Sequence, residues 1–169
     1  MRAVLSATFL LLAAPVVSAG ALANFGWFAG LVGSCWSGQF PDGKTRHSQC
    51  YTSQFDRFVR GTAKLSGEHD GEMKDQFFGD SLFAWDEKDQ KIVYYIWGSD
   101  GGHGRYEANY AGDELLFPVR SRKDPTVIAY RSAWRRIDAD SFEVRRESPD
   151  GTGWKTELTV FYHKDGATQ

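Results

Sequence analysis

The chain has few cysteines and little excess charge, and each shortage excludes a class of protein. Its 169 residues include two cysteines, Cys35 and Cys50, which excludes the dense disulfide framework that holds many small secreted domains together. Twenty basic residues stand against 22 acidic ones. This near-balance gives no general attraction to nucleic acid or to anionic membranes, so we expect neither as a partner.

Catalytic and metal-binding motifs are also missing from the sequence. It contains no Ser-His-Asp arrangement, Cys-His pair, phosphate-binding Gly-rich loop or zinc-ligand spacing. We therefore predict a binding protein without a metal or resident cofactor rather than an enzyme. A lyase or isomerase inside a barrel is the alternative, because an inward acid such as Glu107 or Asp80 with a few arginines would leave no motif.

One apolar run stands out, and it lies at the N-terminus. Residues 3–17 are small or apolar and follow the basic Arg2, and small residues suit signal peptidase at several bonds between positions 19 and 23. The run is shorter than the roughly 20 residues that span a bilayer. We predict a signal peptide over residues 1–23, a periplasmic or secreted protein, and no stable membrane insertion.

Short segments of alternating apolar and polar residues fill the rest of the chain, and turn-forming pairs such as Asp42-Gly43 separate them. Ten segments are strand candidates: 34–40, 45–52, 56–65, 75–86, 91–98, 104–110, 114–121, 126–137, 142–148 and 154–163. This pattern predicts an all-β, up-and-down antiparallel barrel of about 8–10 strands. We expect one monomeric domain over residues 24–169, with the apolar residues 24–32 as a short helical plug. A two-sheet sandwich is the alternative.

The two cysteines lie symmetrically about the Asp42-Gly43 turn. A two- or four-residue loop would place Cys35 opposite Cys50 on the outer face of one hairpin, with Trp36 pointing inward, and would allow a disulfide. A three-residue loop would slip the pairing by one residue and separate the thiols onto opposite faces.

Two stretches resemble a known family. Leu31-Val32-Gly33-Ser34-Cys35-Trp36, followed by the Pro41-Asp42-Gly43 turn, is similar to the opening Gly-x-Trp strand of lipocalin-like barrels of the calycin superfamily. Residues 142–151, with Trp154 and Tyr162, resemble the closing hairpin of an uncharacterised bacterial family of that type. Cys35 is an extra residue between the glycine and the tryptophan. The resemblance implies a barrel with a cavity and carries no agreed activity.

The candidate ligand-binding residues follow from the inward faces of the strands. Pairing Ile137 with Phe142 places Arg131, Arg135 and Arg146 inside, where an arginine must meet an acid, reach water at the rim or bind an anionic ligand. Trp36, Tyr95 and Trp97 are the candidate aromatic lining, although residues 94–97 are apolar on both faces and the pattern leaves open which alternate set points inward.

We therefore predict an exported barrel that binds a small apolar or amphipathic ligand, such as a fatty or aromatic acid if the arginines bind its head group. Haem is the alternative cofactor, because the related nitrobindin-like barrels bind it. The last strand of such barrels would offer His163 as the ligand, but the alternation with Lys155, Glu157 and Thr159 predicts that His163 faces solvent. His47 is the histidine that the pattern places inward.

Overall fold

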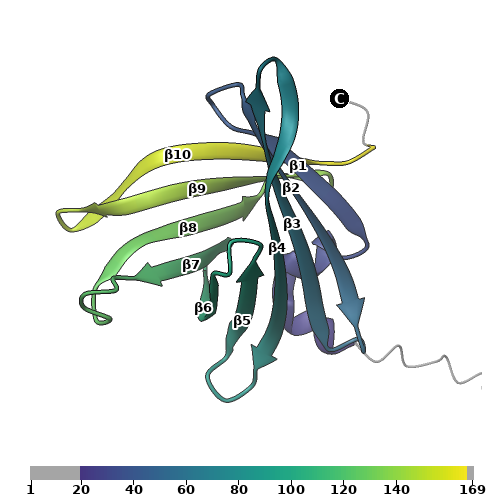
Figure 1. Ribbon diagram of the computed structural model, residues 1–169. Helices are drawn as coiled ribbons and strands as arrows, with labels where there is room; N and C mark the ends of the chain where they lie inside the picture. Colours follow the sequence, from purple (N-terminus) through teal and green to yellow (C-terminus); the bar gives the residue numbers. More distant parts are fainter. Residues whose placement is uncertain (1–19, 167–169) are drawn as a thin grey trace, which may run out of the picture.

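Ten antiparallel strands follow one another around a closed barrel in the computed structural model, which describes residues 20–166 (Figure 1). The strands are β1 (Ser34–Gln39), β2 (Thr45–Gln54), β3 (Phe58–His69), β4 (Glu72–Asp86), β5 (Lys91–Gly98), β6 (His103–Ala111), β7 (Glu114–Arg120), β8 (Ile128–Arg136), β9 (Ser141–Asp150) and β10 (Gly153–Lys164). Each strand pairs with its sequence neighbours, and β10 pairs with β1. The predicted up-and-down barrel is confirmed. The predicted signal peptide lies mostly in residues 1–19, outside the described residues.

Local turn chemistry explains how the first hairpin forms. Gly43 has a φ of 67°, which glycine adopts at little cost. The Asp42 carboxylate accepts hydrogen bonds from the backbone N–H groups of Lys44 and Thr45, both at 2.8 Å, and from the Thr45 hydroxyl at 2.7 Å. These bonds hold the pKa of Asp42 below its ordinary value. The resulting register pairs Cys35 with Cys50, and the predicted disulfide is confirmed.

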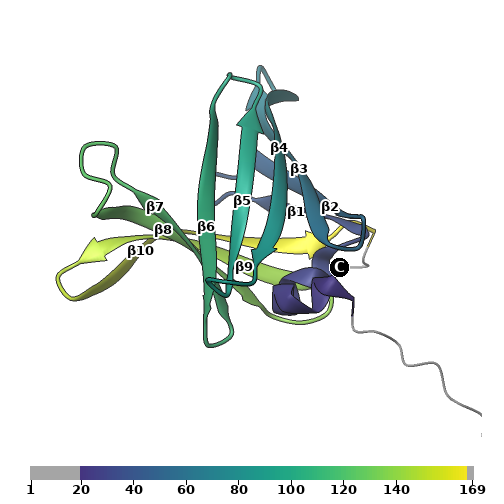
Figure 2. The same cartoon turned by 90° about the horizontal axis from the view of Figure 1, so that it is seen from below.

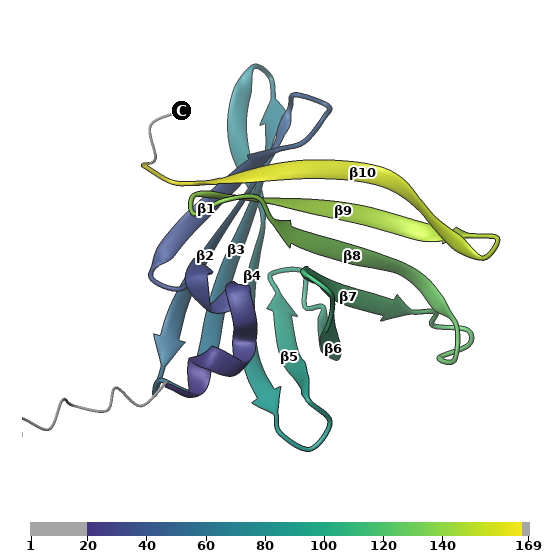
Figure 3. The same ribbon diagram turned by 180° about the vertical axis from the view of Figure 1, so that it is seen from behind.

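The barrel closes unevenly. Three residue pairs join β6 to β7, and three join β1 to β10. The strands on either side of these short seams run in different directions, with β8–β10 crossing the line of β4–β6 (Figure 2). As a result, most of β10 runs beyond β1 as a long free edge (Figure 3).

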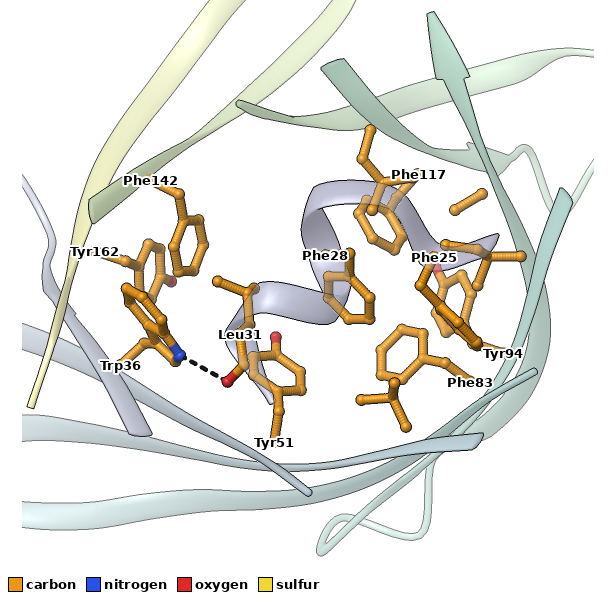
Figure 4. Packing of buried hydrophobic residues seen from close by; sticks show 14 of the residues in the cluster. Phe25, Phe28, Leu31, Trp36, Tyr51, Phe83, Tyr94, Phe117, Phe142 and Tyr162 are labelled. Carbon is orange, nitrogen blue, oxygen red and sulfur yellow. Dashed lines mark hydrogen bonds between the residues drawn. The ribbon is translucent and has the colours of Figure 1, made fainter. Parts of the chain in front are cut away.

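The short helix η1 (Ala21–Leu31) closes one end of the barrel, as predicted for the plug. Its side chains Phe25, Phe28 and Leu31 are almost completely buried among the aromatic side chains of the barrel (Figure 4). The Tyr110 hydroxyl donates to the Phe25 carbonyl at 2.6 Å, and the Trp27 indole donates to the Asp113 carbonyl at 3.0 Å. The plug is thereby fixed to the turn between β6 and β7. Among residues 20–166, no helix has the length and apolar character needed to cross a bilayer.

The register between β8 and β9 corrects one prediction. Arg136, not Ile137, pairs with Phe142, and Trp134 pairs with Val144. Trp134 therefore points inward, where it packs against Phe28 with ring centroids 6.2 Å apart. Because a slip of one residue exchanges the two faces of a strand, Arg131 and Arg135 lie on the outer face.

Candidate functional site

The end of the barrel away from the plug opens into a cavity of about 400 Å³. Its rim includes the loop between β5 and β6 and the loop after β7, at strand ends opposite the hairpin that holds η1. Aromatic side chains form most of the apolar wall: Phe77, Phe83, Tyr94, Tyr106, Phe117 and Trp134.

The floor of the cavity is a set of rings in mutual contact. Tyr94 stacks on Phe83 at 5.2 Å and on Tyr106 at 5.4 Å between ring centroids. Phe117 lies 4.8 Å from Trp134. Phe28 of the plug contacts Phe83 from below at 5.0 Å. Because stacked and edge-to-face rings hold one another in place, the floor is a rigid apolar surface.

A chain of hydrogen-bonded polar side chains crosses the barrel interior beside the cavity. Tyr51 donates to the Gln49 side-chain oxygen, and the Gln49 amide lies 3.3 Å from His47 Nδ1. The Tyr162 hydroxyl lies 2.7 Å from the same Nδ1. Gln49 is 7% exposed and lines the cavity, so this hydrogen-bonded network reaches the cavity wall at Gln49.

Burial sets the ionisation of this chain. It lowers the pKa of His47 to about 4, so the imidazole is neutral at pH 7. Burial also raises the pKa values of Tyr51 and Tyr162 above that of a free tyrosine. The hydrogen-bonded side chains beside the cavity are therefore neutral at pH 7.

Charge is found at the mouth instead. Arg122, His103 and Asp100 all border the opening, and all three are exposed. One Asp100 carboxylate oxygen accepts the Gly102 backbone N–H at 2.9 Å. Arg122 is thus the permanently cationic side chain among the residues that line this cavity, at the edge where water can still reach it.

Arg131 and Arg135, which were predicted to lie inside, belong to an ion-pair layer on the outside. Arg131 Nε donates to Glu147 at 2.7 Å, and Arg135 donates to Glu143 at 2.8 Å. Arg145 joins the layer by contacting Glu143, Glu147 and Glu114. Glu143 and Glu147 are about 6% and 5% exposed, so these arginines serve as structural partners of buried carboxylates.

The other predicted ligand residues are also separated by the fold. Arg146 does lie on the inward face, but near the free end of β9, with its guanidinium 4.4 Å above the Tyr130 ring. Trp36 is buried beside the plug and donates to the Leu31 carbonyl at 3.1 Å. Tyr95 and Trp97 lie on the outer face of β5, opposite Leu82 and Asp80 of β4. Trp97 borders the cavity rim, although its ring belongs to the outer face.

The inward residues of the central strands were missed because neighbouring positions are equally apolar. Tyr94 and Ile96 line the cavity, while the residues that follow each of them, Tyr95 and Trp97, do not face its interior. Gly79 on β4 and Gly104 on β6 lie on the inward face, where an added Cβ would come within 3.0 Å of the Phe77 ring and 2.5 Å of the Tyr106 ring, respectively. These glycines mark the inner face and were the available signal.

The histidines are distributed between the two faces of the wall. As predicted, His47 points inward and His163 lies on the outer face of β10, opposite Ser37. His163 therefore cannot reach the cavity. Within residues 20–166, no three side chains of His, Cys, Asp or Glu are grouped to hold a metal ion.

Comparison with known proteins identifies the architecture and no activity. No protein-family model matches the chain, and no curated protein matches it. Among solved structures, the chain is similar to the crystal structure of Rv2717c from M. tuberculosis, with a TM-score of 0.53 and 14% sequence identity over 85% of this chain and 96% of that chain. At this identity the similarity shows a shared fold, and the lipocalin-like resemblance stays a prediction.

Proposed function

We propose that this protein binds a small, mainly apolar molecule in the open cavity. The observation that carries the proposal is a preformed, aromatic-lined space of about 400 Å³ at the end that the plug leaves open. Ligand pockets commonly measure about 300–1,000 Å³ and combine an apolar wall with a few polar groups. Here Gln49, Ser81 and Ser132 supply those polar groups along the wall.

A ligand with a ring or short chain would lie against Phe83, Tyr94 and Trp134, and a polar group would point to the mouth. A carboxylate is supported by Arg122, not by the outward Arg131 and Arg135. Arg122 would make a charge-assisted hydrogen bond there without complete loss of its hydration. The proposed ligand class is therefore an aromatic or short fatty acid, held mainly through its apolar part.

The proposal includes export to the periplasm or the medium. The confirmed disulfide is compatible with an oxidising compartment. Leu22 packs against the buried core from within η1. Cleavage of the predicted signal peptide after Ala19 would retain this contact, whereas cleavage after Ala23 would remove it, so we favour the earlier bond.

Native mass spectrometry of protein purified from its own cell envelope would reveal a retained ligand directly. In parallel, 1-anilinonaphthalene-8-sulfonate, an apolar anion, should bind the wild type with enhanced fluorescence. Ser132→Phe should abolish binding by filling the cavity, while Thr52→Phe on the exposed outer face of β2 should not. Equal binding by the wild type and Ser132→Phe would refute the cavity as the site.

The anion preference has its own test within this system. Arg122→Met should weaken binding of a naphthoate more than binding of naphthalene methanol, which is neutral. Lys123→Met is the matched control, because Lys123 is exposed in the same loop and does not line the cavity. An equal loss for both ligands would assign Arg122 a structural role.

A further inference from the structure

Three large aromatic side chains are exposed together on the outer face of β4 and β5, on the side of the wall opposite the cavity. Phe78 is 53% exposed, Tyr95 41% and Trp97 50%. Tyr95 and Trp97 are stacked, with centroids 6.4 Å apart and planes within 19°. We call Phe78, Tyr95 and Trp97 the outer aromatic patch. None of the three is needed to fill the core.

The patch borders two adjoining hollows. The larger measures about 480 Å³ and lies between Phe78 and Trp97, over the backbone of Gly79 and Gly98. The smaller measures about 300 Å³ and extends toward Leu82. Arg60, Asp80 and Trp97 border both hollows, so the two form consecutive parts of one shallow groove across β3, β4 and β5, which lie side by side in Figure 2.

We propose that this groove binds a neutral oligosaccharide, with one pyranose ring against Trp97 and the next over the adjoining hollow. The C–H groups on one face of a pyranose carry partial positive charge and suit the negative face of an aromatic ring. The hydroxyl groups around the ring need donors and acceptors in its plane. Arg60 and Asp80, whose side chains are 56% and 51% exposed and 3.3 Å apart, offer both at the shared border of the hollows.

The charges around the groove favour a neutral ligand. The charged side chains of β3–β6 that lie near the patch occur in ion pairs, among them Arg60–Asp80, Lys64–Asp75 and Arg105–Glu107. A single-stranded nucleic acid could stack on the same rings, but its binding needs an excess of positive charge along the groove. No such excess is present among these pairs.

The size and composition of the patch also argue against a protein partner. A stable protein interface buries about 800 Å² on each side and has an apolar centre depleted of charge. Here the Arg60–Asp80 ion pair lies beside Trp97 at the centre of the patch, and the surface is grooved rather than flat. A chain of linked rings fits this groove better than a second folded surface does.

Cellohexaose, maltohexaose and chitohexaose can serve as the test probes, and the backbone N–H signals of Gly79 and Gly98, which lie under the groove, can serve as reporters in ¹H–¹⁵N NMR spectra of the wild type and of every variant. We expect a saturable shift with at least one of the three. Trp97→Ala should weaken that binding about tenfold or more, as loss of one stacking ring does in other systems. Trp154→Ala is the matched control, because Trp154 is an exposed tryptophan on β10, opposite Pro149.

The cavity-filling variant Ser132→Phe separates this site from the proposed cavity site, and it should bind the oligosaccharide like the wild type. Absence of a saturable shift with all three probes would overturn the proposal, as would binding that survives in Trp97→Ala. A wild-type dimer in light scattering that becomes a monomer in Trp97→Ala would also overturn it, because the patch would then be an interface between copies of the chain.

Discussion

Replacement of Phe28 by alanine tests whether the plug supports the floor of the cavity. Phe28 is completely buried, and its ring lies 5.2 Å from Tyr51, 5.0 Å from Phe83 and 6.2 Å from Trp134. Large-to-small changes of a buried phenylalanine cost about 3–5 kcal/mol of unfolding free energy. A domain of this size has about 5–15 kcal/mol in total, so we expect Phe28→Ala to fold with much reduced stability.

Urea denaturation, monitored by far-UV circular dichroism, can measure this loss of unfolding free energy. With a denaturant slope of about 2 kcal/mol per M, a loss of 4 kcal/mol moves the midpoint down by about 2 M. Phe28→Leu is the control, because it keeps most of the buried volume and should lose far less. Phe83 and Trp134 line the cavity and contact Phe28. Phe28→Ala should therefore also change the affinity for 1-anilinonaphthalene-8-sulfonate. A stability loss below about 1 kcal/mol would refute the reasoning.

Three further predictions concern the remaining supports of the barrel. Cys35→Ser with Cys50→Ser should lower the unfolding free energy by about 3 kcal/mol, since the bridge closes a loop of 15 residues; equal urea midpoints for oxidised and reduced wild type would contradict this. The folded-state pKa of His47 is about 4, against about 6.5 in the unfolded chain, so the unfolded chain binds the proton more tightly. The unfolding free energy should therefore be highest above pH 6.5 and fall by at most about 3 kcal/mol toward pH 4. His47→Gln should flatten that part of the stability profile, and an unchanged slope would exclude His47 as its origin. Arg145→Met should cost about 3 kcal/mol at pH 7, because it removes a cationic partner from the buried carboxylates of Glu143 and Glu147; a urea midpoint equal to that of the wild type would argue against unpaired carboxylates as a cost.

The strands and the disulfide could be predicted because local chemistry determines them. Each strand of the barrel is bounded by turn residues close in sequence, so the ten segments were recognisable without knowledge of the rest of the fold. The hairpin at Asp42 is the clearest case. A side chain that accepts hydrogen bonds from the backbone two and three residues later fixes the loop length, and the loop length fixes the pairing of Cys35 with Cys50.

The outward orientation of Arg131 and Arg135 could not be predicted, because the turn after β8 contains no sequence signal for its length as strong as Asp42 in the first hairpin. The N–H groups of Ile137 and Asp138 both point to the Ser141 carbonyl, at 3.1 Å and 3.3 Å, and Ile137 is left 51% exposed outside the strand. An exposed isoleucine is indistinguishable in sequence from a buried one. The prediction that Ile137 points inward reversed the predicted orientation of every side chain on β8. It therefore placed Arg131 and Arg135 inside the barrel and Trp134 outside.

Paired apolar residues on β4 and β5 connect the proposed cavity site with the proposed groove. Phe77 lines the cavity and Phe78 the outer patch, while Tyr94 and Tyr95 divide between the two faces in the same way. A strand that buries one face usually places polar residues on the other, because exposed aromatic side chains add no core packing and invite association. Folding alone therefore does not explain the neighbouring aromatic pairs Phe77-Phe78 and Tyr94-Tyr95, which prevented prediction of the inward face of these strands. An outer face selected to contact a ligand would account for them, and this is the physical reason to expect that the wall of this barrel binds on both sides.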